Sequence, residues 1–182
     1  MKKKEFVLTA IELNPYDHND FIWMDACIIS EEAIIPLISA NFPVSSRIPM
    51  DRMLLLNVNP FTVQDEDKAN NITGNFENKD RIAAGIIAGN MDNWLKWSDL
   101  YDTTMNRYLE AGMFVGKEQN IMSSMVLENK EFISLVNPPK NFGKKLLYLL
   151  IYLGVSDRRF KVLSSFAGNS VESYQSIASL YP

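Results

Sequence analysis

Three short, continuous apolar runs constrain the fold of this chain more than any other feature of its sequence. They occupy residues 21–24, 53–58 and 82–87. Apolar runs of this length, without alternating polar residues, are typical of strands that are buried on both faces. Because amphipathic, helix-like segments lie between and around the runs, the pattern predicts an α/β domain with a mostly parallel central sheet flanked by helices.

Composition excludes several classes of protein. The chain has 182 residues, which suits a single domain, and 47% of them are apolar, which is enough for a core. Its formal net charge of -4 disfavours a role in binding duplex nucleic acid by neutralising phosphates. Cys27 and His18 are the only residues of their types. An intrachain disulfide framework, a multi-thiolate zinc site and a mechanism that needs two histidines are therefore excluded.

No segment has the pattern of a membrane-crossing helix or a signal peptide. The basic N-terminus leads into a brief apolar stretch, which Glu12 and Asn14-Pro15 interrupt. Residues 146–153 form the longest apolar run, but they fall well short of the roughly 20 residues that cross a bilayer. A buried helix or strand is the favoured interpretation of this run, and an interfacial anchor is the alternative. We expect a cytoplasmic protein without a transmembrane segment.

Helical spacing and capping signals predict the remaining elements. Helices are expected at residues 3–13, at 93–111 after an Asp92 cap, and from 116 to 126. Two further helices are expected at 30–39 and 170–180. Residues 59–79 are predicted to form a long polar loop, and loops of this kind are commonly either functional lids or disordered segments. Within the third apolar run, Gly85 is expected to permit a close backbone approach.

Three features carry chemistry, and each has a structural alternative. Asp25 ends the first apolar run, where a carboxylate can either contribute to a ligand site or form a turn. Gly85 and Asn90 lie in a glycine-bracketed segment that leads into a helix, so its backbone can approach a sugar or simply pack closely. Glu118 and Gln119 open another helix, where they can bind hydroxyl groups or cap backbone amides.

The order of these features resembles the HtrL/YibB-type (WlaTC-like) family of bacterial and viral glycosyltransferase-like proteins, which has the GT-A fold. The segments that carry the resemblance are 10–16 (AIELNPY), 21–28 (FIWMDACI), 81–89 (RIAAGIIAG) and the Glu118-Gln119 pair. The resemblance implies a GT-A-like, incomplete Rossmann-like domain over residues 1–182. It also implies that the domain is the C-terminal two thirds of a full one, with a separate N-terminal half that binds the nucleotide.

The resemblance further implies transfer of a sugar from a nucleotide-sugar donor to a glycan or other acceptor. Asp25 and Glu118 would be catalytic, and Asp25 would hold Mn²⁺ or Mg²⁺ on the diphosphate. The residues expected to bind donor or acceptor are Trp23, Arg81, Gly85, Asn90 and Gln119. Cys27 stands at the third place of an Asp-x-Asp pattern, which leaves Asp25 as a single carboxylate. The alternative function is a non-catalytic fragment or interaction module that keeps the family's shape.

Overall fold

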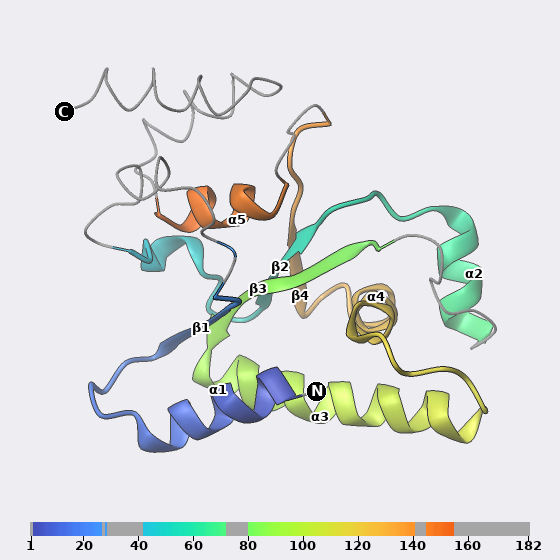
Figure 1. Ribbon diagram of the computed structural model, residues 1–182, viewed down its shortest axis with the longest axis horizontal. Coiled ribbons are helices and arrows are strands. Elements are labelled where there is room, and N and C mark those ends of the chain that lie inside the picture. Colours follow the sequence, from blue (N-terminus) through green and yellow to red (C-terminus); the bar gives the residue numbers. More distant parts are fainter. Residues whose placement is uncertain (1, 27, 29–41, 72–79, 141–144, 155–182) are drawn as a thin grey trace.

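A single four-stranded sheet with helices on both faces forms the body of the protein (Figure 1). The computed structural model describes residues 2–26, 28, 42–71, 80–140 and 145–154. The strands are β1 (Asp20–Met24), β2 (Met53–Asn57), β3 (Ile82–Asn90) and β4 (Ile133–Val136). The helices are α1 (Lys2–Leu13), α2 (Val63–Asn71), α3 (Met91–Glu110), α4 (Glu118–Glu128) and α5 (Lys145–Gly154), with a short 3-10 helix, η2 (Ser45–Arg47).

The sheet is mixed, so the predicted mostly parallel, GT-A-like sheet is wrong. Its strand order is β1-β3-β2-β4. The β1/β3 and β2/β3 pairs are antiparallel, and the β2/β4 pair is parallel. A continuous apolar run reports burial on both faces of a strand, but it carries no information about the direction of the neighbouring strands. The three predicted runs do lie in one sheet, where β3 separates β1 from β2.

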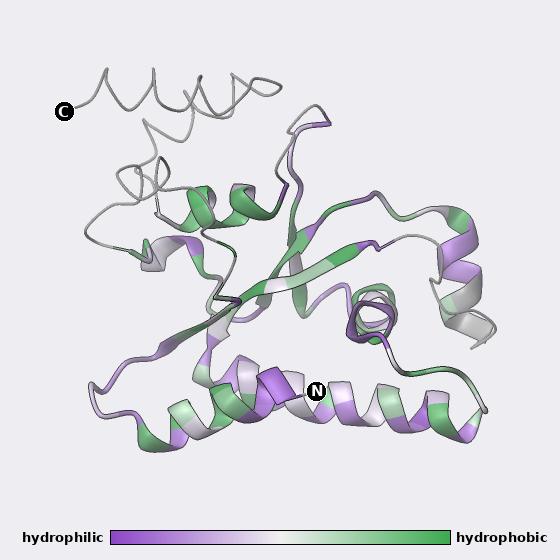
Figure 2. Cartoon of the chain, in the orientation of Figure 1, coloured by the Kyte–Doolittle hydropathy of each residue, from purple (hydrophilic) through white to green (hydrophobic). Residues whose placement is uncertain are grey.

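Two apolar cores explain why the strand sequences are apolar throughout. Leu54 and Leu56 of β2 face the core that α5 covers, whereas Met53 and Leu55 face the core formed with α1, α3 and α4. This alternation is the ordinary period of a strand, with successive side chains on opposite faces. Figure 2 shows α5 hydrophobic along most of its length and α3 carrying both polar and apolar residues.

Most predicted helices are confirmed within one to a few residues. Helix α1 matches the prediction for 3–13, α4 matches that for 116–126, and the apolar run at 146–153 is helical in α5. Helix α3 begins at Met91, and its cap is Asn90 rather than Asp92, because the Asn90 side chain accepts the backbone N–H of Asn93. The helices predicted at 30–39 and 170–180 lie outside the described residues.

One prediction about secondary structure needs correction, and one strand was not predicted. The stretch 59–79 was expected to be a loop, but its described part contains helix α2, which begins with Asp65 and Glu66 in its first turn. Acidic residues at this end of a helix are stabilised by the helix dipole. Strand β4 was not expected, since only its two end residues, Ile133 and Val136, are buried and the apolar pattern is weak.

Candidate functional site

The ammonium group of Lys3 is the meeting point of two acidic residues that are far apart in the sequence. Lys3 Nζ lies 3.2 Å from Asp25 Oδ1 and 2.8 Å from Glu118 Oε1. It also donates to the backbone carbonyl of Ala84 at 2.9 Å. An ammonium has three N–H donors, and these contacts supply an acceptor for each of them. We call this group of Lys3, Asp25, Glu118 and the Ala84 carbonyl the Lys3 cluster.

The end of β1 positions Asp25. The backbone N–H of Asp25 donates to the carbonyl of Gly85 at 2.8 Å, which extends the β1/β3 pairing by one residue beyond Met24. The indole N–H of Trp23 donates to Asp25 Oδ1 at 2.7 Å. Trp23 in turn stacks on Phe6 of α1, with 6.1 Å between ring centroids. The carboxylate is therefore held by its own strand and by a tryptophan that packs on α1.

An irregularity in β3 makes the Ala84 carbonyl available to Lys3. Leu55 of β2 pairs with Ile87, but the next residue, Leu56, pairs with Ala83. The residues between Ala83 and Ile87 therefore have no register partner on β2. Such bulges free backbone groups from the ladder and redirect them. Here the freed carbonyl of Ala84 accepts the Lys3 ammonium.

Helix α4 brings Glu118 to the cluster through its first turn. A carboxylate at this end of a helix is favoured by the helix dipole. Tyr101 of α3 lies close by, and burial together with the carboxylates of Glu118 and Asp102 raises the pKa of Tyr101 to about 12. Lys4 pairs with Asp102 and donates to Ser98 of α3. Adjacent lysines of α1 thus connect to α3 and to the Lys3 cluster.

The structure brings together several of the residues that the sequence singled out. Asp25 and Glu118 share Lys3, Trp23 binds Asp25, and Gly85 lies next to the Asp25 carboxylate. Gln119 follows Glu118 in the first turn of α4, and its backbone carbonyl accepts the hydroxyl of Ser123. Their proposed roles in catalysis and binding stay predictions.

Asn90 lies away from this group. It pairs with Asp20 at the start of β1, whereas Asp25 follows the end of that strand. Asn90 lies five positions along β3 from Gly85, which is roughly 16 Å at about 3.3 Å per residue. Its side chain also has a structural task, since it caps α3 and donates to the carbonyl of Met50. Asn90 and Asp25 therefore lie at opposite ends of the β1/β3 pair.

Arg81 is engaged in a buried ion pair at the start of β3. Its guanidinium lies 2.8 Å from Asp65 Oδ2 and donates to the carbonyl of Pro60 at 2.7 Å. Both partners of the ion pair are buried, with side-chain exposures of 10% and 5%. The guanidinium of Arg81 therefore contacts α2 and the segment before it, away from the Lys3 cluster.

The close backbone approach expected at Gly85 is not found, because its neighbours lie at ordinary distances. A Cβ atom on Gly85 would lie 3.5 Å from Asp25 Oδ2, which is an ordinary van der Waals distance. A Cβ on Gly89 would lie only 2.5 Å from the sulfur of Met53. Gly89, at the far end of β3 from Asp25, therefore has less room for a side chain than Gly85, and the atom in the way belongs to the end of the Met53 side chain.

Lys3 is the member of the cluster that sequence reasoning missed. The basic N-terminus was considered only as the possible start of a signal peptide. A usable signal was present, because Lys3 and Lys4 adjoin the buried positions Val7 and Ile11 of α1. A lysine beside the buried face of a helix requires an acidic or carbonyl partner from another element.

The oxygen atoms of the cluster match, in kind, those that bind Mg²⁺ or Mn²⁺. Asp25 and Glu118 offer carboxylates, and Ala84 offers a carbonyl, but the ammonium of Lys3 contacts all three. Among the residues that the structure describes, no three His, Cys, Asp or Glu side chains are grouped so that they could hold a metal ion. Metal binding at Asp25 stays a prediction.

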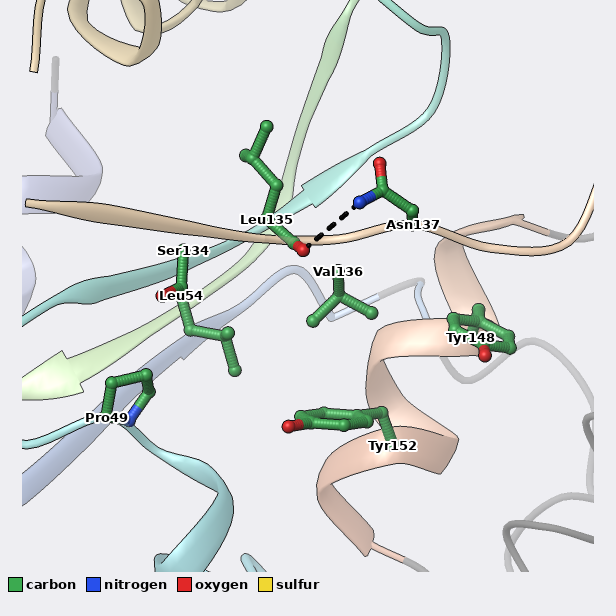
Figure 3. Close-up of a pocket in the computed structure, with 8 residues that line it drawn as sticks. All are labelled: Pro49, Leu54, Ser134, Leu135, Val136, Asn137, Tyr148 and Tyr152. Atoms are coloured by element: carbon green, nitrogen blue, oxygen red, sulfur yellow. Dashed lines mark hydrogen bonds between the residues drawn. The ribbon is translucent and has the colours of Figure 1, made fainter. Parts of the chain in front are cut away.

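A separate surface pocket lies between the sheet and α5 (Figure 3). It has a volume of about 320 Å³, and it contains none of the residues that the sequence singled out. Tyr148 and Tyr152 of α5 border it on one side. On the other, Asn137 donates to the carbonyl of Leu135. Its lining residues are Pro49, Leu54, Ser134, Leu135, Val136, Asn137, Tyr148 and Tyr152.

None of the helices in the described ranges is both long enough and apolar enough to cross a membrane. Comparison with known proteins identifies no relative: the chain matches no protein-family model, no curated protein and no solved structure.

Proposed function

We propose that this chain transfers a sugar from a nucleotide-sugar donor to a glycan or other acceptor. The observation that carries the proposal is the meeting of Asp25 and Glu118 at one ammonium group beside Gly85. Paired carboxylates from separate elements are a common arrangement for acid–base chemistry and for stabilising positive charge in a transition state. The sequence resemblance to glycosyltransferase-like proteins supports the same choice of reaction.

Glu118 has the role of general base or stabiliser of the oxocarbenium-like sugar in this proposal. Either task requires an ionised carboxylate near the anomeric carbon. In this proposal Asp25 acts on the leaving-group side of the reaction. The indole N–H of Trp23, which donates to Asp25 Oδ1, fixes the orientation of its carboxylate. Mn²⁺ or Mg²⁺, when bound at Asp25, would supply positive charge to the diphosphate leaving group.

The proposed partners are the nucleotide-sugar donor, the acceptor and a separate N-terminal half that binds the nucleotide. One structural feature supports the last of these. In the described part of the chain, β1 pairs with β3 alone, so its outer edge offers backbone groups for another strand. The cytoplasm is the proposed location, in keeping with a chain that has one cysteine and hence no intrachain disulfide.

A non-catalytic interaction module is the second candidate. The observation that favours it is the Lys3 contact itself, because an ammonium bonded to both carboxylates leaves neither of them as a free base. In this case the Lys3 cluster holds α1, β1, β3 and α4 together and takes no part in a reaction.

Turnover of nucleotide-sugars by the full chain distinguishes the two candidates. UDP-, GDP- and CDP-linked sugars are incubated with the protein, and release of the nucleotide and transfer to glycans are measured. We expect Glu118→Gln and Asp25→Asn to abolish activity. Glu110→Gln and Asp51→Asn, which change exposed acids, are the matched controls. A folded chain that neither binds nor turns over any donor would support the interaction module, and full activity of Glu118→Gln would refute the proposed mechanism.

A further inference from the structure

The Lys3 ammonium lies where three oxygen acceptors meet. Its acceptors come from three different elements: Asp25 follows β1, the Ala84 carbonyl belongs to β3, and Glu118 begins α4. Two carboxylates and one ammonium leave the cluster with one excess negative charge. Without Lys3 the excess would be two negative charges, held beside a carbonyl oxygen that also points at the same place.

A divalent cation and the ammonium cannot share this position. Mg²⁺ binds its oxygen ligands at about 2.0–2.1 Å, in sites built from one or two carboxylates with water or phosphate completing the shell. The ammonium lies 2.8 Å from Glu118 and 2.9 Å from the Ala84 carbonyl. An ion that contacts the same oxygens would therefore overlap with Lys3 Nζ, and the two positive charges would repel each other.

The placement of Lys3 in α1 allows its side chain to withdraw. Lys3 belongs to the first turn of the helix, where backbone N–H groups lack partners within the helix and local opening requires the least free energy. The helix is anchored further along, by Lys4, Val7 and Ile11, which are buried. Lys3 can thus leave the carboxylates while the rest of α1 stays packed.

We propose that Lys3 is a tethered cation that closes the site formed by Asp25, Glu118 and the Ala84 carbonyl, and that a divalent cation binds there only when Lys3 withdraws. The importance of this competition for catalysis rests on the proposed function, in which Glu118 acts as a base or stabiliser. Withdrawal of Lys3 would free the Glu118 carboxylate for that role. The competition itself involves only the chain and the metal ion.

Binding of Mn²⁺ alone to the full-length chain tests the proposal without any sugar donor. Free Mn²⁺ is measured by electron paramagnetic resonance for the wild type and for Lys3→Met, which keeps an apolar stem of similar length. Lys2→Met is the matched control, since Lys2 is exposed and its loss changes the net charge equally. We expect Lys3→Met to bind Mn²⁺ tighter by on the order of tenfold or more, and Lys2→Met to resemble the wild type. Adding Asp25→Asn to Lys3→Met should remove the gain.

The indole resonance of Trp23 reports where Mn²⁺ binds, because this indole N–H is bonded to Asp25. Paramagnetic broadening of Trp23 is expected in Lys3→Met and not in the wild type at the same concentration. If Lys3→Met does not fold, the same measurements are made on Lys3→Gln, which retains a donor for the Ala84 carbonyl. Equal Mn²⁺ affinity of the wild type and the folded Lys3 variants, or a gain without broadening of Trp23, would overturn the proposal. Absence of donor turnover alone would contradict only the proposed function.

Discussion

Trp23 donates its indole N–H to Asp25 Oδ1 at 2.7 Å, although the two residues are only two positions apart. Side chains at positions i and i+2 of a strand lie on the same face, so the end of β1 directs both side chains to one side of the sheet. Phe6 and Lys3 of α1 cover the Trp23 ring, with the Lys3 ammonium 5.8 Å from its centroid. Trp23 therefore links α1 to the carboxylate at the centre of the candidate site.

Replacing Trp23 with Phe should destabilise the protein modestly. The variant keeps an aromatic ring for Phe6 to stack on, but it removes the donor to the half-buried Asp25 carboxylate. We expect the free energy of unfolding to fall by about 1 kcal/mol, as measured by urea denaturation. Tyr16→Phe, at an exposed aromatic residue, is the control and should have no such effect. Equal stability of the two variants would show that the Trp23–Asp25 hydrogen bond contributes nothing.

The two glycines of β3, Gly85 and Gly89, should respond differently to the same substitution. Gly89→Ala would place a methyl group 2.5 Å from the sulfur of Met53, which is fully buried. The end of the Met53 side chain must shift within a packed core, so this overpacking should lower the free energy of unfolding by about 1 kcal/mol. Gly85→Ala meets only ordinary contacts, the nearest at 3.5 Å, and should retain wild-type stability. Thermal or urea denaturation measures both, and a larger loss for Gly85→Ala would contradict the packing described.

The positions of the first three strands could be predicted from the sequence, but their directions could not. The apolar runs that form β1, β2 and β3 mark segments covered on both sides, and such coverage is the same for parallel and antiparallel neighbours. The antiparallel direction of β3 relative to β1 and β2 depends on the path of the segments that connect the strands. Residues 59–79, which include α2, were interpreted as a loop because they are rich in Asn and Asp.

The candidate site was predictable only in part, because its contacts are not local. Asp25 and Glu118 stood out as acids at the ends of elements, and the structure does place both on one ammonium. The ammonium belongs to Lys3, in a basic stretch that resembles an ordinary solvated terminus. Asn90 was assigned to the same site from its position after a glycine, yet its side chain caps α3 at the other end of β3.

The buried ion pair of Arg81 and Asp65 should make stability depend on pH in the acidic range. Burial alone would raise the pKa of Asp65, but hydrogen bonds from Thr62 and Arg81 and the charge of Arg81 outweigh burial and lower it below 3.8. The carboxylate therefore contributes stability that is fully present above the unfolded pKa, near pH 3.8. This contribution is lost as the pH falls through the lower folded pKa.

Asp65→Asn should remove this acidic dependence and destabilise the protein at neutral pH. The variant leaves the Arg81 guanidinium buried without its counter-ion, which should cost about 3 kcal/mol. Urea denaturation at neutral pH and below pH 3.8 measures both effects. Asp51→Asn, at an exposed acid, is the control and should follow the wild type. Wild-type stability of Asp65→Asn at neutral pH would show that the ion pair is not needed to hold α2 against β3.

Tyr101 should make the protein sensitive to alkaline pH. Burial, with smaller contributions from the carboxylates of Glu118 and Asp102, raises the pKa of Tyr101 from 10.0 to about 12. The folded state therefore keeps the phenol protonated while the unfolded state releases its proton near pH 10. Because the unfolded state then binds fewer protons, stability is fully present below pH 10 and is lost as the pH rises toward 12.

Tyr101→Phe tests this contribution, since it keeps the buried ring and removes the ionisable hydroxyl. The wild type should lose on the order of 2 kcal/mol of unfolding free energy through Tyr101 between pH 10 and pH 12, and Tyr101→Phe should lose correspondingly less. Lysines and the other buried tyrosines titrate in both proteins, so only the difference between the two denaturation series matters. In Glu118→Gln, absorbance of the tyrosinate should appear at lower pH, because one of the charges that raises the pKa of Tyr101 is gone. An unchanged titration in Glu118→Gln would mean that Glu118 does not lie near the Tyr101 hydroxyl, and the proposed arrangement of the Lys3 cluster would then be wrong.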